Sequence, residues 1–153
     1  MSLPLDVALA QCDRHAGILL DALSQIPAPL TEAHLRQASP EFIRLLDQFV
    51  LRFTKLQDTL GAHVLRQFAV QVLAEPVEDA AFIDVLNLLE RRGYLMAEDW
   101  AAQRNTRNIL THEYPDDPMR QALALSAAQA AALQLVGWLR DIQERAKAWA
   151  AVP

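Results

Sequence analysis

The pattern that most constrains this sequence is one long apolar stripe in its first half. Apolar residues recur at intervals of three or four positions from Phe42 to Val72, which is the spacing of one face of an α-helix. Ser39-Pro40 precedes the stripe as an N-cap residue followed by proline at the first helical position. The predicted helix runs to about residue 74 and is on the order of 50 Å long, with Gly61 as a place where it can bend. A helix of this length in a chain of 153 residues must pack against two or more other helices or against a second subunit.

Similar patterns in the rest of the chain predict further helices. Only four glycines are present, and the hairpin pairs Asn-Gly and Asp-Gly do not occur. Alanine, leucine, glutamine, glutamate and arginine are abundant, and all are good helix formers. We expect helices over residues 5–23, 79–92, 97–113 and 119–149, with a short turn or helix after Thr31, an N-cap at Asp79 and a left-handed C-cap at Gly93. The sequence therefore predicts a single domain over residues 1–153, an all-α, up-and-down bundle of four to five helices.

The charge of the chain argues against a broad nucleic-acid-binding surface. The net charge is −5 and the pI is about 5.3. Any contact with RNA must therefore come from a local cluster of basic residues. Cys12 is the only cysteine, which excludes an internal disulfide and a cysteine-based zinc site. It falls on an apolar helical stripe, so we expect a thiol in the core.

The sequence also bears on where the protein is found. The N-terminus lacks the basic start of a signal peptide. Residues 122–139 come closest to a membrane span, but Ser126, Gln129 and Gln134 interrupt them, which favours a buried, alanine-rich helix. We expect a cytoplasmic protein that does not contact a membrane.

The helix expected over residues 97–113 is unlike the others. Six consecutive polar residues, Gln103 to Asn108, lie between Trp100 on one side and Ile109-Leu110 on the other. A helix with this pattern either lies on the surface or lines a polar cleft. On a regular helix Arg104, Asn108 and His112 share one face, and Arg107, Thr111 and Tyr114 line the neighbouring strip.

The residue types in this helix suggest chemistry on a phosphate. Arg107 supplies a fixed cation, His112 an imidazole that can accept or donate a proton, and Tyr114 a phenol. On a regular helix Arg107 and His112 are about 140° apart, so they converge only over a groove that spans both strips. The alternative is a solvated helix end in which arginines pair with nearby carboxylates and His112 caps the C-terminus.

Other kinds of site have little support in the sequence. The phosphate-binding glycine loop, the nucleophile elbow and the His-Glu-x-x-His zinc pair do not occur. His15, His34 and His63 lack metal-ligand spacing, and His112-Glu113 lacks a second histidine. We therefore expect no metal and no cofactor, and the polar helix is the one candidate site.

The segment Arg107-Asn108-x-x-x-His112-x-Tyr114 resembles the Arg-x4-His-x-Tyr signature of HEPN domains. The chain is most similar to the HEPN partner of HEPN/MNT toxin–antitoxin pairs and to nucleotidyltransferase substrate-binding proteins. The likeness extends to an all-α chain of about this length with the motif at the end of a late helix.

The resemblance implies a homodimer in which two motif helices face each other across a cleft, and an endoribonuclease that needs no metal. It implies that Arg107 holds the scissile phosphate and that His112 is the general acid or base. Asn108 would orient His112 or the phosphate, with Arg104 and Thr111 in support. Tyr114 would close the site and serve as the acceptor when an MNT nucleotidyltransferase modifies and silences the toxin.

Two functions stay open on this basis. The first is a dimeric ribonuclease toxin, with RNA as substrate, that an MNT antitoxin neutralises. The second is a non-catalytic substrate-binding or regulatory subunit of a nucleotidyltransferase. Glu113, Asp116 and Asp117 beside the motif favour the second, because they give a poor field for attracting RNA.

Overall fold

The computed structural model describes residues 3–112 and 116–153, and the described part of the chain is helical with no strand. The elements in chain order are α1 (Leu5–Ser24), α2 (Glu32–Arg36), α3 (Pro40–Thr59), η1 (Leu60–Val64), α4 (Leu65–Gln67), η2 (Phe68–Val72), α5 (Phe82–Arg91), α6 (Ala97–Leu110) and α7 (Pro118–Ala150). The all-α prediction is confirmed for these residues.

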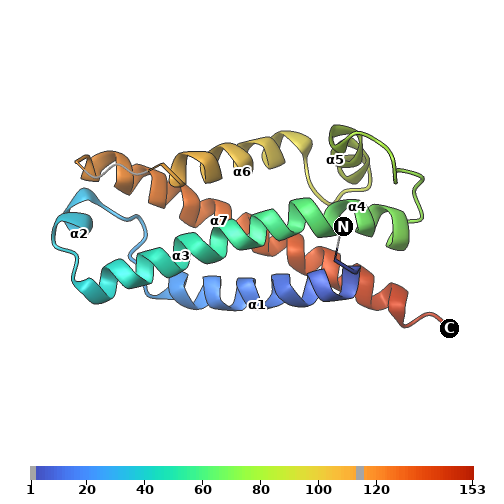
Figure 1. Cartoon of the computed structure of the whole chain (residues 1–153), viewed down its shortest axis with the longest axis horizontal. Helices are drawn as coiled ribbons and strands as arrows, with labels where there is room; N and C mark the ends of the chain where they lie inside the picture. Colours follow the sequence, from blue (N-terminus) through green and yellow to red (C-terminus); the bar gives the residue numbers. More distant parts are fainter. Residues whose placement is uncertain (1–2, 113–115) are drawn as a thin grey trace.

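The four long helices alternate in direction. Figure 1 shows α3 running through the middle of the molecule, with α1 along one side, α6 along the other and α7 crossing behind. The short helix α2 lies at one end and α5 at the other. The core between these helices consists mainly of phenylalanine, leucine and isoleucine side chains with almost no exposure: Phe49, Phe53, Phe68, Leu19, Leu56, Leu60, Leu65, Leu89, Leu135, Leu139 and Ile142. Cys12 is also buried, as expected.

The long central helix is present as predicted, but it is not α-helical throughout. α3 begins at Pro40, where the Ser39 side chain accepts a hydrogen bond from the backbone of Phe42. Two π-helical turns follow, η1 and then η2, which ends at Val72, and the short α4 lies between them. Gly61 lies in the first of them, and a Cβ added there would come within 2.9 Å of the Trp100 ring on α6. The glycine thus lets α6 approach the central helix closely.

Two expected helix ends differ from the structure. α5 begins at Phe82 after Ala81, so the prediction of Asp79 as its N-cap was wrong. α6 ends at Leu110 and not near residue 113, because the Thr111 hydroxyl donates to the Asn108 carbonyl and the His112 backbone donates to Ile109. The predicted left-handed residue Gly93 is confirmed, with φ of 81°.

Helix α7 is 33 residues long and contains a strongly apolar segment. It is long and apolar enough to cross a membrane, with a mean hydropathy of 1.5 over its most apolar 18 residues, and half of that window is buried inside the structure. Asp117 caps its start by accepting a hydrogen bond from the Arg120 backbone at 3.1 Å. The buried half packs on the other helices, as the core of a bundle requires.

Candidate functional site

The polar run of α6 packs against its neighbours through hydrogen bonds. Gln103 and Gln57 are both buried, at 1% and 0% exposure. The Gln57 amide nitrogen donates to the Gln103 carbonyl at 2.9 Å, and the Gln103 amide nitrogen donates to Ala131 and Gln134, each at 2.8 Å. One amide pair therefore connects α3, α6 and α7, and it fixes the rotation of α6 about its own axis.

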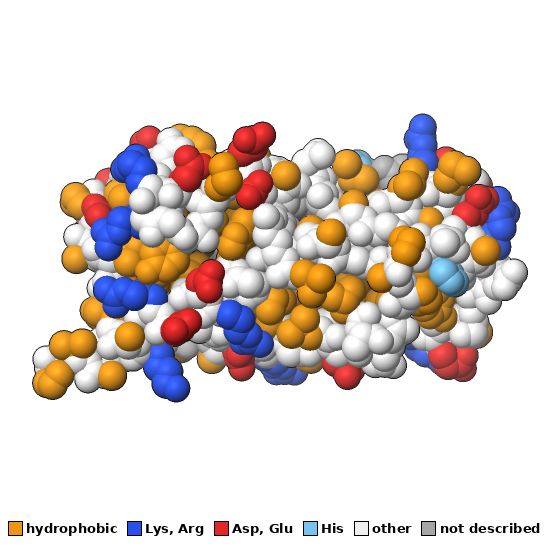
Figure 2. All heavy atoms as spheres, turned by 180° about the vertical axis from the view of Figure 1, so that it is seen from behind, with side chains coloured by type: hydrophobic (Ala, Val, Ile, Leu, Met, Phe, Trp, Pro, Cys, Tyr) orange, Lys and Arg blue, Asp and Glu red, His pale blue; other side chains and the backbone are white. Residues whose placement is uncertain are grey.

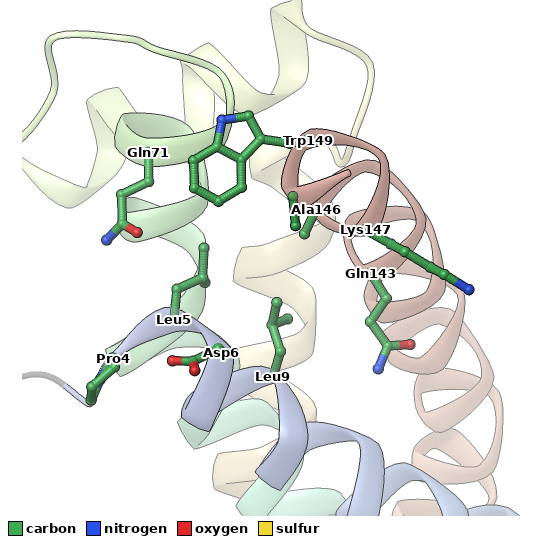
Figure 3. A pocket seen from close by; sticks show the side chains of 10 residues that line it. Pro4, Leu5, Asp6, Leu9, Gln71, Gln143, Ala146, Lys147 and Trp149 are labelled. Carbon is green, nitrogen blue, oxygen red and sulfur yellow. The ribbon is translucent and has the colours of Figure 1, made fainter. Parts of the chain in front are cut away.

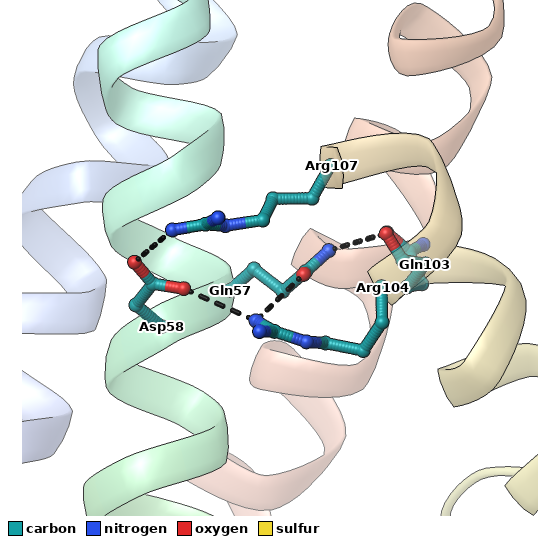
Figure 4. A network of polar contacts seen from close by, with 5 residues as sticks. All are labelled: Gln57, Asp58, Gln103, Arg104 and Arg107. Carbon is teal, nitrogen blue, oxygen red and sulfur yellow. Dashed lines mark hydrogen bonds and ion pairs between the residues drawn. The ribbon is translucent and has the colours of Figure 1, made fainter. Parts of the chain in front are cut away.

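Arg104 and Arg107 meet on one carboxylate of the central helix (Figure 4). Arg107 Nη2 donates to Asp58 Oδ2 at 2.9 Å, and Arg104 Nη1 donates to Asp58 Oδ1 at 3.2 Å. Arg104 also donates to the Gln57 side-chain oxygen at 3.2 Å. Because two guanidinium groups share one carboxylate, the cluster keeps a net positive charge.

Arg107 is the less exposed of the two arginines, with a quarter of its side chain accessible against 42% for Arg104. Its Nε is buried and has no hydrogen-bond partner within residues 3–112 and 116–153. A buried donor without a partner costs about 1–3 kcal/mol. The guanidinium therefore has donor capacity that Asp58 does not use.

A groove of about 590 Å³ lies beside this cluster, where the end of α6 meets α3 and the start of α7. Its lining is part apolar and part polar: Asp47, Val50, Leu51, Thr54, Leu110, Thr111, His112, Gln121, Ala124 and Leu125. The Thr54 hydroxyl is buried and has no partner in the described chain. The groove is thus lined by the exposed His112 imidazole and by Thr54, and it leaves room for a ligand between the helices.

The structure divides the predicted site residues into two groups. Arg104 and Arg107 converge on Asp58, whereas Thr111 and His112 line the groove. Asn108 is exposed, and its side chain forms no hydrogen bond to any described residue, so nothing places it against either group. Tyr114, the predicted acceptor, lies outside the described residues.

Both groups face α3. The prediction of a regular helix through the motif, with Arg107 and His112 about 140° apart, was wrong because α6 ends at Leu110. Beyond that end the chain turns, and His112 comes to lie in the groove with Thr54 of α3. The α3 residues that line the groove run from Asp47 to Thr54, so the groove begins about one helical turn before Asp58.

Three residues of the site were not identified from the sequence: Gln57, Asp58 and Thr54. A signal for them exists, since Thr54 and Asp58 are one helical turn apart and Gln57-Asp58 interrupts the apolar face. Their contacts with α6 arise only from tertiary packing.

A second cavity of about 490 Å³ lies at the other end of the bundle, between the start of α1 and the end of α7. Figure 3 shows Leu5, Leu9 and Trp149 around it, with Lys147 pointing away. The described lining offers one carboxylate, Asp6, and the Lys147 side chain, but no imidazole or guanidinium, so this cavity does not repeat the residue types of the motif.

Among the described residues, no three or more His, Cys, Asp or Glu side chains are grouped so as to hold a metal ion. The chemistry that the arrangement can support is charge stabilisation by Arg104 and Arg107 and proton transfer by His112. Comparison of the chain with family models, with curated proteins and with solved structures finds no match.

Proposed function

We propose that this chain is a HEPN-type endoribonuclease toxin that works without a metal, as a homodimer with a composite active site, and is neutralised by an MNT nucleotidyltransferase. One observation carries the proposal: the motif arginine and the motif histidine both face α3, where Arg107 pairs with Asp58 and His112 lines the groove formed with the preceding turns of that helix. The alternative, a solvated helix end whose arginines pair with carboxylates, accounts for the two pairs with Asp58 but not for the buried Nε of Arg107.

Each motif residue has its own role in the proposed cleavage of RNA. Arg107 binds the scissile phosphate and stabilises the charge that develops on its oxygens, with Arg104 adjacent. His112 takes the proton from the ribose 2′-hydroxyl, whose oxygen attacks phosphorus while the 5′-oxygen leaves with a proton from a second imidazole. The products are a 2′,3′-cyclic phosphate and a 5′-hydroxyl, so no water and no metal enters the step.

The second imidazole is the reason for a dimer. One chain supplies one His112, and a base and an acid are both needed. Exposed apolar residues next to the motif suit a second copy: Ile109, Met119 and Leu123 are 40%, 58% and 67% exposed. Leu123 and Ile109 also line a hollow of about 300 Å³ between α6 and α7. Figure 2 shows apolar side chains gathered over the middle of the rear face, with charged side chains around them at both ends and along its upper and lower edges.

Without RNA, Asp58 pairs with both arginines of the site. Its carboxylate occupies donors that a phosphate would use, so RNA must displace it or bind the donors that it leaves free. In the proposed complex Tyr114 is the residue that the MNT partner nucleotidylates, which adds negative charge to the motif and opposes RNA binding.

The test is cleavage of a labelled RNA by the purified chain in the presence of a chelator. We expect the wild type to cut and His112→Ala to lose about 10²–10⁴-fold in rate, which is the usual contribution of a general acid or base. His34→Ala, on α2 in a separate capping contact with Thr31, is the matched control and should cut at the wild-type rate. No cleavage by the wild type, or equal rates for the two variants, contradicts the proposal.

A second candidate function is a non-catalytic subunit that binds a nucleotidyltransferase. The observation in its favour is that Asp58 already occupies both arginines in a chain of net charge −5. Under this alternative the chain forms a stable complex with an MNT-type nucleotidyltransferase and has no RNase activity in the assay above.

A further inference from the structure

The side of α3 that faces α1 carries a group of basic side chains outside the site described above. Arg52 of α3 reaches His15 of α1, with Arg52 Nη1 at 3.0 Å from His15 Nδ1. Lys55 and Arg14 are exposed on the same two helices. None of the three cations forms an ion pair with a carboxylate in the part of the chain that the structure describes.

The contact between Arg52 and His15 determines which donors remain free. A guanidinium can only donate, so His15 Nδ1 accepts and the ring carries its proton on Nε2. Arg52 Nε is buried without a partner among the described residues. The pair therefore retains an imidazole N–H and guanidinium N–H groups that no described residue accepts.

The local charge is positive. Burial, followed by the charges of Arg52, Lys55 and Arg14, lowers the pKa of His15, and no carboxylate contributes to the shift. Across a chain with a net charge of −5, such a cluster is a local positive potential that attracts an anion.

We propose that Arg14, His15, Arg52 and Lys55 form a phosphate-binding site, and that its ligand is a phosphodiester of single-stranded RNA. Guanidinium, ammonium and imidazole N–H groups together match phosphate oxygens. Lys55 is three residues from Asp58, so it lies about 5–6 Å from the residue that holds Arg104 and Arg107. The choice of RNA rests on the proposed function, whereas the phosphate chemistry follows from these side chains alone.

The experiment measures binding of a fluorescent single-stranded RNA of ten nucleotides to full-length protein carrying His112→Ala, which prevents cleavage under the proposed mechanism. Removing two phosphate contacts lowers the slope of log K against log salt by about 1.4 for single strands. We expect Arg52→Gln/Lys55→Gln to show this decrease and to bind about tenfold more weakly at low salt. Inorganic phosphate should compete with RNA for the His112→Ala protein. This competition should be mostly lost when Arg52→Gln/Lys55→Gln is added.

The matched control is Arg91→Gln/Lys147→Gln, which removes the same charge from exposed positions elsewhere. Equal affinity and equal salt slope in the two double variants overturn the proposal, as does a His112→Ala protein that binds no RNA. If Arg52→Gln/Lys55→Gln fails to fold, Lys55→Gln alone tests it, with about half the change in slope. If RNA binding depends on Arg52 and Lys55 but the wild-type chain does not cut RNA, the proposed function is contradicted. The phosphate-binding site is then still supported.

Discussion

Asp58 lies between the two arginines of α6 and takes up part of the charge that they bring to the central helix. Its carboxylate is 2.9 Å from Arg107 and 3.2 Å from Arg104. All three side chains are partly exposed, so these pairs add little to stability, on the order of 1 kcal/mol or less each. The larger effect of Asp58 is on an incoming phosphate, which competes for the same donors.

Replacing Asp58 by asparagine tests that competition. Asp58→Asn keeps an oxygen acceptor for the arginines and removes the negative charge, so we expect RNA to bind about five- to tenfold more tightly, the effect of one nearby charge in a partly solvated site. The measurement is RNA affinity in the His112→Ala background. Asp21→Asn, an exposed change of equal charge on α1, should leave affinity nearly unchanged. Tighter binding by both variants would show that only the net charge matters.

His15 makes the stability of the fold depend on pH. Burial and the neighbouring cations Arg52, Lys55 and Arg14 lower its pKa below the ordinary 6.5, so the folded chain binds this proton less readily than the unfolded chain. Stability is therefore fully present above pH 6.5 and declines as pH falls through the folded pKa.

The variant His15→Asn should remove this part of the pH dependence, because an amide oxygen still accepts from Arg52 and does not titrate. The measurement is the free energy of unfolding in urea at about pH 7.5 and about pH 5.5. We expect the decrease in the free energy of unfolding from the higher to the lower pH to be smaller in His15→Asn than in the wild type. His34→Asn is the control, and an equal decrease in all three proteins contradicts the assignment.

Among the secondary-structure elements, the sequence predicts the positions of helices well where apolar periodicity is strong. The stripe from Phe42 to Val72 marks the central helix correctly, and Ser39-Pro40 marks its start. The π turns η1 and η2 have no signature of their own in the apolar pattern. The end of α6 was predicted about three residues too late, because the local hydrogen bonds of Thr111 and His112 compete with the helical pattern.

Gly61 permits the close contact between the central helix and α6. A Cβ at this position would lie 2.9 Å from the Trp100 ring. We expect Gly61→Ala to destabilise the fold by about 1–3 kcal/mol, as overpacking does, although alanine is the better helix former. The measurement is urea unfolding.

Gly17 provides the matched control, since it lies within α1 and a Cβ added there meets nothing within 4 Å. Gly17→Ala should be stabilising by up to about 1 kcal/mol. Changes of the same sign in both variants would show that the contact with Trp100 does not limit the packing of α6.

For the whole molecule, the sequence predicted the all-α class and identified the helix that carries the candidate site. It did not reveal Gln57, Asp58 or Thr54, since their roles depend on how α3, α6 and α7 pack. Arg104 and Arg107 were identified by spacing, but their shared carboxylate comes from a helix more than 40 residues earlier. Apolar periodicity shows which residues share a face of one helix. Which residues contact each other between helices depends on the tertiary structure.

The proposed dimer predicts that Leu123→Glu produces a monomer. Leu123 is 67% exposed and lies in the hollow between α6 and α7. A charge in a buried interface is strongly unfavourable, so we expect at least a tenfold weaker dimer by sedimentation. Leu133→Glu, at a position later on α7 that is 58% exposed, is the control. A wild type that is monomeric at all concentrations contradicts the dimer.

The most direct test of the account mixes the wild type with the His112→Ala variant. Under the proposed mechanism a mixed dimer holds a single His112 imidazole and lacks either the base or the acid, so it does not cut RNA. We predict that full subunit exchange in an equal mixture lowers the rate of RNA cleavage in chelator to about half of the rate before exchange, because only about a quarter of the dimers then carry two His112 imidazoles. A rate that subunit exchange leaves unchanged would contradict the composite site, and an inactive wild type would contradict the ribonuclease itself.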